Sequence, residues 1–341
     1  MAKWRYFSPD NWNFLFPQFS HKELRLIEDV IAADDEAAKM MARALQGQGP
    51  AGTFLEIHLF RERPLPGTIG MVIKEAKQDA HATTLKGKIP IAKSQMVFAL
   101  KWVFENEIDT SFMTNIQFLL KNSPDITNGY QVYEHILQDE NGQWHPYWGI
   151  TKRNWKTRYE EHLAAAKRGS QYLFHKELRE LLPKNLSEAH QIPVVGFTEK
   201  EAMDHEEWFV EHFSLFPDNP LGLNMIPGGY AGIQALHRLK VLPKDRSVTP
   251  EERDRVIETY LNEHPRKGVS NPLIAAMWKD EVYAESVICG PEGRLSTAQV
   301  REIRRLSSLG WDAQSIVDVV GARNIGQVER VLGGKTYTRI H

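Results

Sequence analysis

The sequence predicts an α+β protein built from more than one domain, and three observations support this. With 341 residues, the chain is too long for one ordinary domain and suggests two or three. Apolar residues make up 42% of it, which is enough for a sizeable core. Helical and strand-like patterns alternate up to about residue 230, whereas only helical patterns follow residue 249.

Composition narrows the class of protein. The single cysteine, Cys289, excludes an internal disulfide framework and a cysteine-based zinc finger, and it fits a reducing cytoplasm. The first thirty residues lack a basic segment followed by an apolar run, so no signal peptide is expected. No stretch approaches about 18 consecutive apolar residues, so we expect no membrane span. The sequence therefore predicts a cytoplasmic protein.

Residues 1–125 are expected to form an N-terminal α/β or α+β domain. A helical pattern covers residues 21–45, and strand-like patterns cover 52–60 and 68–76, separated by glycine- and proline-rich turns. The sequence does not predict the role of this domain. One alternative is a second nuclease-like site formed by Glu56, Glu75, Lys77 and Asp79.

Residues 127–232 are predicted to form a small α+β domain that opens with a β-hairpin. An alternating run at 130–139 and its partner at 144–152 are rich in aromatic and β-branched residues. Asn141-Gly142 lies between them and is a strong signal for a tight hairpin turn.

Three helices and one strand complete this domain. Asn154 is expected to cap the first helix, and Thr198 caps the last, with glutamates in the turn that follows. Helices are predicted over 155–169, 173–182 and 199–213, and a short buried strand over 194–198. The order is therefore β-β-α-α-β-α.

The rest of the chain is predicted to be helical. Residues 247–290 form a linker or accessory domain, in which Thr249 caps a helix that has Pro250 at its first position. Residues 294–341 form a separate module. The expected helices cover 250–265, 270–288, 296–310, 312–321 and 325–334.

A set of short motifs follows in fixed order between residues 127 and 230. They are, in chain order, Gln131-Val132-Tyr133, Tyr147-Trp148-Gly149, Arg158 with His162 four residues later, Gly169-Ser170, Glu206 and Asn224. In this order and with these intervening elements, the segment resembles the GIY-YIG nuclease family, over a little under a third of the chain. Gln131 and Trp148 stand where the family has glycine and isoleucine.

This resemblance implies a metal-dependent DNA endonuclease that leaves a 5′ phosphate and a 3′ hydroxyl. Glu206 is then the ligand of one Mg²⁺ or Mn²⁺ ion, and Tyr133 is the base that activates water. The implied catalytic residues are Tyr133, Tyr147, Arg158, His162, Glu206 and Asn224.

The residue types suit phosphodiester hydrolysis. The guanidinium of Arg158 is a planar fork that matches phosphate oxygens, whose charge must be neutralised for the reaction. Arg158 and His162 are four residues apart and so share one face of their helix. A tyrosine hydroxyl, of Tyr133 or Tyr147, can position or deprotonate water if a neighbouring cation lowers its pKa.

Structural interpretations of the same residues stay open. Tyr133 and Tyr147 can be ordinary cross-strand core residues, and His162 can be a structural histidine. Asn224 can be a turn residue. Arg158 can belong to a solvated, ion-paired face with Glu160 or Glu161.

The metal ligand has alternatives as well. Glu207 is adjacent to Glu206, and Glu211 lies about one turn further along the same helix. A zinc site is a second possibility. Its ligands would be His205 and His212 together with His162 or His175.

Residues 294–341 carry an excess of positive charge. They contain 8 Lys and Arg against 4 Asp and Glu, a balance of +4, whereas residues 129–230 contain 10 against 15, a balance of −5. This tail resembles the helix-turn-helix modules of phage and homing nucleases, with Gly321 in the turn and residues 325–332 as the recognition helix. The residues expected to contact DNA are Asn324, Gln327, Arg330, Lys335 and Arg339.

Apolar residues in the tail are expected to pack its three helices together. They are Val300, Ile303, Leu306, Ile316, Val319, Val320, Val328, Val331 and Leu332. A helical protein–protein module with a solvated basic face is the alternative interpretation of this pattern.

Two other functions stay open for the whole chain. One is a DNA-binding regulatory protein whose nuclease domain is inactive, and the other is a structure-specific repair nuclease that prefers branched or damaged DNA. The sequence does not indicate the DNA target, whether one or both strands are cut, the oligomeric state, or whether the context is homing, restriction or repair.

Overall fold

The computed structural model describes residues 3–50, 53–61, 68–75, 96–104, 110–184, 187–264, 278–289 and 293–340. The protein is α+β, and its chain divides into two compact units, Met1–Glu263 and His264–His341. No helix among the described residues is long and apolar enough to cross a membrane.

One mixed sheet runs through the first unit, and its seven described strands lie in the order β2-β1-β3-β4-β7-β5-β6. The β1–β3 and β4–β7 pairs are parallel, and the others are antiparallel. The strands are β1 (Thr53–Arg61), β2 (Thr68–Glu75), β3 (Val97–Phe104), β4 (Thr110–Asn115), β5 (Tyr130–Gln138), β6 (Trp144–Thr151) and β7 (Glu188–Phe197).

This continuity changes the predicted domain organisation. The expected boundary between residues 125 and 127 falls inside the first unit, because β4 pairs with β7 from Thr110↔Glu188 to Thr114↔Ile192. The two strands are far apart in the sequence, so local sequence patterns do not indicate that they pair. The two predicted domains therefore share one sheet.

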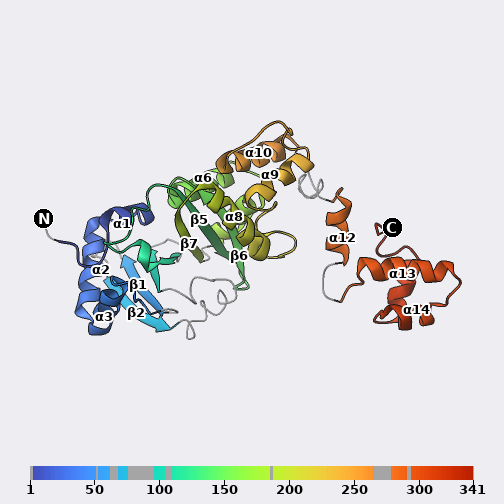
Figure 1. The fold of residues 1–341 in the computed structure, drawn as a ribbon, viewed down its shortest axis with the longest axis horizontal. Coiled ribbons are helices and arrows are strands. Elements are labelled where there is room, and N and C mark those ends of the chain that lie inside the picture. The colour runs from blue at the N-terminus through green and yellow to red at the C-terminus, as the bar shows by residue number, and fades with distance from the viewer. Residues whose placement is uncertain are drawn as a thin grey trace. The chain divides into compact units, whose positions relative to one another are not determined.

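Three helices cover the N-terminal end of the sheet (Figure 1). They are α1 (Pro9–Leu15), α2 (His21–Ala33) and α3 (Asp35–Ala44). The helical pattern over 21–45 is divided at Asp34, which ends α2 and whose side chain accepts the Ala37 N–H at the start of α3. Aromatic side chains of α1 and its flanks, including Trp12 and Phe16, pack on Phe98 of β3.

The second half of this unit follows the predicted β-β-α-α-β-α order. Asn154 and Thr198 cap α6 and α8 as expected, and Gly142 adopts a left-handed conformation, φ +75°, in the hairpin turn. Strand β7 is longer than predicted. The helical elements are α6 (Trp155–Lys167), α7 (Leu173–Leu181), α8 (Glu199–Phe209), the π-helical turn η3 (Val210–Ser214), α9 (Gly229–Arg238) and α10 (Pro250–Glu263).

The two faces of the β5–β6 hairpin pack against different helices. On one face, Val132 and Trp148 join a core with Met203 and Phe209 around α8. On the other, Tyr147 stacks on Phe174 of α7, with ring centroids 4.2 Å apart. Strand β6 is the last strand of the sheet, and α6, α8 and α10 gather near it (Figure 1).

The described part of the second unit is helical. Its elements are α12 (Glu281–Cys289), α13 (Thr297–Ser308), α14 (Ala313–Val320) and α15 (Ile325–Leu332). Six of the nine predicted core residues are buried in one cluster, and Val320 packs against it. Val319 and Leu332 were wrongly assigned to the core, since they are 57% and 39% exposed. The predicted helix over 270–288 lies partly outside the described residues.

Candidate functional site

The site begins with a close approach across the β5–β6 hairpin. Tyr133 and Gly149 are direct partners in this antiparallel pair. A Cβ atom on Gly149 would lie 2.5 Å from the Tyr133 hydroxyl oxygen, far inside contact distance. Gly149 therefore makes room for the phenol, and this is a physical reason for the Tyr-x-Gly spacing.

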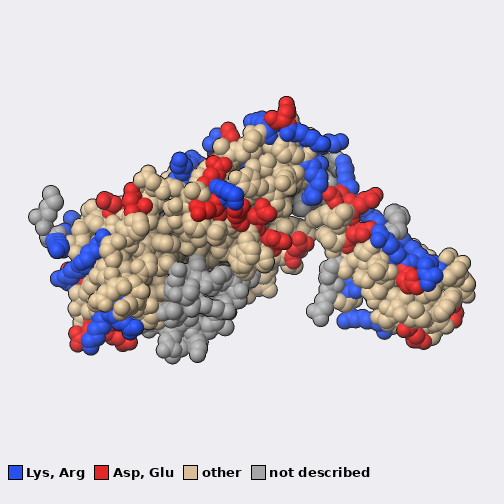
Figure 2. All heavy atoms as spheres, in the orientation of Figure 1, with Lys and Arg blue, Asp and Glu red and all other residues tan. Residues whose placement is uncertain are grey.

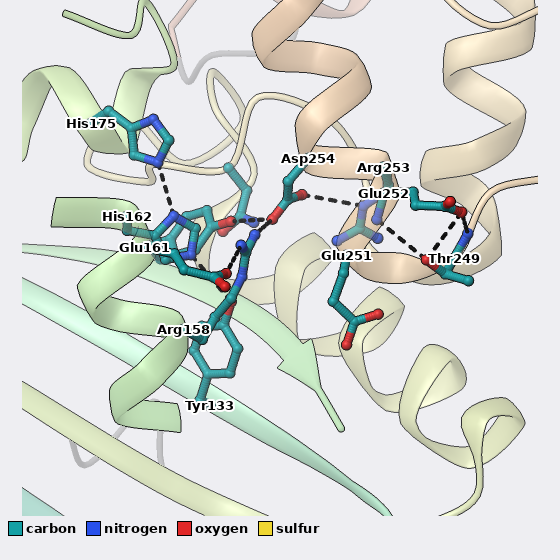
Figure 3. Close-up of polar contacts among 12 residues, drawn as sticks. Tyr133, Arg158, Glu161, His162, His175, Thr249, Glu251, Glu252, Arg253 and Asp254 are labelled. Carbon is teal, nitrogen blue, oxygen red and sulfur yellow. Dashed lines mark hydrogen bonds and ion pairs between the residues drawn. The ribbon is translucent and has the colours of Figure 1, made fainter. Parts of the chain in front are cut away.

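A chain of buried polar groups leads away from the Tyr133 hydroxyl. That oxygen lies 3.4 Å from Nε2 of His162, and Nδ1 of His162 lies 2.8 Å from Nε2 of His175 (Figure 3). Nδ1 of His175 in turn lies 2.8 Å from Oγ of Ser170. With a proton on Nδ1 of each imidazole, every link has one donor and one acceptor. The arrangement can carry a proton away from the phenol.

Burial sets the charge state of this chain. It raises the pKa of Tyr133, and the neighbouring Arg158 offsets only part of the rise. Burial also lowers the pKa of His162 well below its usual range, and lowers the pKa of His175 to about 3. All three groups are therefore uncharged at neutral pH. The predicted lowering of the Tyr133 pKa by a cation is outweighed by burial.

Arg158 lies next to this chain on the buried face of α6. Its side chain is 8% exposed and forms ion pairs with Glu161, at 2.9 Å, and with Asp254. Burial is the largest single influence and opposes its charge, but Asp254 and the other groups around the guanidinium together outweigh it and raise the pKa of Arg158. The pairing with Glu161 was one of the structural alternatives, but the guanidinium is buried rather than on a solvated face.

Glu206 lies on α8 and is fully buried. Its two carboxylate oxygens each accept a hydrogen bond from the Arg253 guanidinium, both at 2.7 Å. One of them also accepts the backbone N–H of Gly229 at 2.8 Å. Glu206 thus forms a bidentate, buried ion pair at the start of α9.

The neighbouring glutamates have other roles. Glu207 accepts the backbone N–H of Ala231 at 3.0 Å, so it caps the start of α9. Glu211 is exposed on η3. Of the three candidates, Glu206 is the one that reaches the buried ion-pair network.

Two charged residues of α10 connect these parts, and the sequence interpretation did not include them. Arg253 holds Glu206, Asp254 holds Arg158, and the Tyr147 hydroxyl lies 3.4 Å from Asp254 Oδ2. Figure 3 shows both residues projecting from α10 toward the site. A signal was present: Arg253 occupies the same helical stripe as the buried Ile257 and Leu261, where an apolar residue is normal.

Asn224 does not join this network in the described contacts. Its side chain accepts the Trp148 N–H at 2.9 Å and donates to the Trp148 carbonyl at 2.8 Å. Its oxygen also accepts from Ser214 Oγ at 2.6 Å. The carboxamide thus pairs with the outer edge of β6 as another strand would. The contacts support a structural role rather than the predicted catalytic one.

The arrangement does not fit a divalent metal ion as it stands. Both oxygens of the predicted ligand Glu206 are taken by Arg253. Within the described ranges, no group of three or more His, Cys, Asp or Glu side chains could hold a metal. The zinc alternative is not supported either, because its histidines do not come together in a group of three potential ligands among the described residues, and His162 and His175 contact each other.

The second nuclease-like site considered in the N-terminal region can be assessed only at Glu56, whose carboxylate is engaged by neighbouring side chains. Glu56 is buried, forms an ion pair with Lys101 at 3.2 Å and lies within hydrogen-bond distance of His58 Nε2, at 2.5 Å. Lys77 and Asp79, and the side chain of Glu75, lie outside the described residues.

In the second unit, the residues predicted to contact DNA differ in their availability. Arg330, Lys335 and Arg339 are exposed. Asn324 caps α15 by accepting the Gln327 N–H, which leaves its carboxamide oxygen engaged. Figure 2 shows lysine and arginine side chains gathered along one face of this unit, with acidic side chains among them.

Comparison with known proteins gives no family assignment. No model of a protein family matches the chain, and no curated protein or solved structure shows significant similarity to it. Its function is therefore inferred from the geometry of the site.

Proposed function

We propose that the protein is a DNA endonuclease of the GIY-YIG type that hydrolyses phosphodiester bonds, with Mg²⁺ or Mn²⁺ as the expected cofactor. The observation that carries the proposal is the convergence of a phenol, a guanidinium and a carboxylate from β5, α6 and α8. The Tyr133 hydroxyl lies 3.4 Å from His162, which shares the buried face of α6 with Arg158. Arg158 and Glu206 are connected through α10, because Arg158 pairs with Asp254 and Glu206 pairs with the adjacent Arg253.

Arg158 is the phosphate-binding group in this proposal. Its guanidinium is positively charged at any accessible pH and already binds an oxyanion, the Asp254 carboxylate. A DNA phosphate offers the same kind of acceptor oxygens. In a site largely withdrawn from water, this charge stabilises the negative charge that builds up on the phosphoryl oxygens.

The Tyr133 chain supplies the path for the proton. A water molecule gives its proton to the Tyr133 oxygen, while the phenol gives its own proton to Nε2 of His162. His162 then passes its Nδ1 proton to Nε2 of His175, whose low pKa makes this a transient acceptor. The hydroxide attacks phosphorus, the bond to the 3′ oxygen breaks, and that oxygen is protonated by solvent. The products are a 5′ phosphate and a 3′ hydroxyl.

The second unit is proposed to be the DNA-binding module, of the helix-turn-helix kind. Three features support this: the +4 balance of residues 294–341, the short helices α14 and α15 joined by left-handed Gly321 at φ +70°, and the exposed Arg330. Because the catalytic segment is acidic, delivery to DNA falls mainly to this unit.

A plasmid-nicking assay tests the proposal. The full chain is incubated with supercoiled plasmid and Mg²⁺ or Mn²⁺, beside Arg158→Ala and Tyr133→Phe, and the ends are mapped by labelling. Lys156→Ala is the matched control, because Lys156 is on the outer side of α6 in an exposed pair with Glu160. We expect nicking by the wild type and the control only. Equal nicking by all four proteins would exclude this site.

One observation favours a second candidate, a DNA-binding regulatory protein with an inactive nuclease domain. The Arg253–Glu206 pair occupies the carboxylate that a metal ion would need. This function would be favoured if the wild type binds DNA but does not nick it under any metal condition. Variants that release Glu206 should then not nick it either.

A further inference from the structure

The site contains its own pair of opposite charges, contributed by adjacent residues of one helix. On α10, the Arg253 cation faces the Glu206 carboxylate and the Asp254 anion faces the Arg158 guanidinium. Arg253 and Asp254 therefore occupy the positions that a metal ion and a DNA phosphate would take in the proposed reaction. A metal cation would bind Glu206, and a DNA phosphate would bind Arg158.

We propose that Arg253 and Asp254 are an internal occupant of the nuclease site, which a divalent cation and a DNA phosphate must displace before cleavage. This inference rests on the proposed function and adds a means of regulating the same site. The free protein is held closed, and binding of DNA opens it.

The exposure of the four groups gives the order of displacement. Glu206 is 0% exposed, Arg253 6% and Arg158 8%, whereas Asp254 is 14% exposed. Asp254 is thus the group that an incoming phosphate meets first. Once a phosphate replaces it on Arg158, Arg253 loses a neighbouring carboxylate and its hold on the site weakens.

The contact between the two occupants is incomplete. Asp254 Oδ1 and Arg253 Nε are buried and have no hydrogen-bond partner among the described residues, and they lie 3.6 Å apart. Buried polar groups are normally hydrogen-bonded, so this geometry carries a cost that displacement relieves. The closed arrangement therefore leaves two buried polar atoms without hydrogen bonds in the described part of the chain, which opening can relieve.

In this proposal, helix α10 moves as a unit when the site opens. Thr249 and Glu252 form a reciprocal cap at its start, which keeps the helix intact by itself. It touches the sheet at the end strand β6, where Glu251 accepts the backbone N–H of Lys152 at 3.2 Å. This contact, the buried Ile257 and Leu261, and the ion pairs of α10 with Arg158 and Glu206 hold it over the site.

Metal binding tests the role of Arg253 without depending on cleavage. Mn²⁺ affinity of the full chain is measured by electron paramagnetic resonance for the wild type, Arg253→Gln and Arg255→Gln. The control removes the same charge from an exposed position two residues along α10. We expect Arg253→Gln to bind Mn²⁺ about tenfold more tightly or better, because the binding-competent fraction rises, and the control to match the wild type. Adding Glu206→Gln should abolish the gain. Unchanged affinity in Arg253→Gln would overturn the proposal.

Asp254→Asn provides a second test if Arg253→Gln fails to fold, which circular dichroism reports. This variant removes the anion from Arg158 and keeps the size of the side chain. Affinity for a DNA duplex in EDTA, measured by fluorescence anisotropy, should rise about tenfold. An unchanged affinity counts against the internal occupant.

A plasmid-cleavage assay on the same proteins distinguishes the proposed nuclease function from the proposed internal occupant. If the wild type nicks plasmid but neither variant binds its ligand more tightly, the internal occupant is refuted and the nuclease function stands. If the variants bind more tightly but nothing nicks, the nuclease function fails while α10 still closes a ligand site.

Discussion

Tyr133 and Gly149 face each other across β5 and β6, and the phenol oxygen fills the space that a Cβ on Gly149 would need. One residue of the hairpin thus fixes the position of the other. The same close approach sets the distance from the phenol to His162. The geometry of the whole site depends on this pair.

Gly149→Ala should therefore move the phenol and destabilise the protein. Inserting a methyl group into a packed site typically costs about 1–3 kcal/mol. Urea denaturation measures the change in the free energy of unfolding. In a double-mutant cycle, Tyr133→Phe should recover part of the loss, since it removes the nearest atom. Additive effects of the two substitutions would contradict the predicted clash.

His175 should make stability depend on pH. Its folded-state pKa of about 3 lies below its ordinary value of 6.5, so the unfolded chain binds more protons between these limits. The free energy of unfolding should thus fall as pH decreases from about 6.5 toward 3. His175→Gln removes this contribution, and its stability should fall less over pH 4.5–7. Parallel curves for the two proteins would show that His175 is not buried in its neutral form.

Asn224→Ala should affect stability rather than chemistry. It removes both hydrogen bonds to the Trp148 backbone, and unsatisfied buried groups cost about 1–3 kcal/mol each. Nicking per folded molecule should remain near wild type. Ser214→Ala, which removes a single bond to Asn224, should be milder. A large loss of turnover at full stability would return Asn224 to the catalytic group.

Removal of residues 294–341 should lower DNA affinity far more than turnover at saturating DNA. Arg330→Ala should weaken binding and reduce the slope of log affinity against log salt by about one. Arg305→Ala is the control, because Arg305 is engaged with Glu302 at 2.7 Å on α13. Equal loss of affinity and turnover on truncation would contradict the proposal that the second unit binds DNA while the first unit cleaves it.

Substrate preference separates a sequence-directed nuclease from a structure-specific repair nuclease. Because the second unit offers one short helix, α15, beside exposed arginine and lysine, we expect linear duplexes to be bound as well as branched ones. Competition between matched linear and four-way-junction DNA measures this. A strong preference for the junction would instead favour the repair function.

Local signals predicted the elements that they specify directly. The Asn141-Gly142 turn, the Asn154, Thr198 and Thr249 caps and the left-handed Gly321 all lie where the sequence indicates, because each depends on a few neighbouring residues. Such features need no distant partner.

Features that depend on distant partners were not predictable in this way. Pairing of β4 with β7 joins residues more than 70 positions apart, and Arg253 finds Glu206 only after α10 folds back over β6. The contacts of Asn224 with the Trp148 backbone were not predicted, because its spacing in the sequence says nothing about which backbone groups its amide meets. The clue in the sequence was that Arg253 lies in the same helical stripe as the apolar Ile257 and Leu261.

The seven-stranded sheet has a practical consequence for work on fragments. A protein trimmed to residues 127–232 would lose β4 and leave one side of β7 as a bare edge, open to pairing with a second molecule. It would also lose the Leu15 carbonyl that accepts the Trp155 indole N–H at 2.8 Å. Such an exposed edge favours aggregation, so tests of the proposed activity should use a protein that keeps the N-terminal strands.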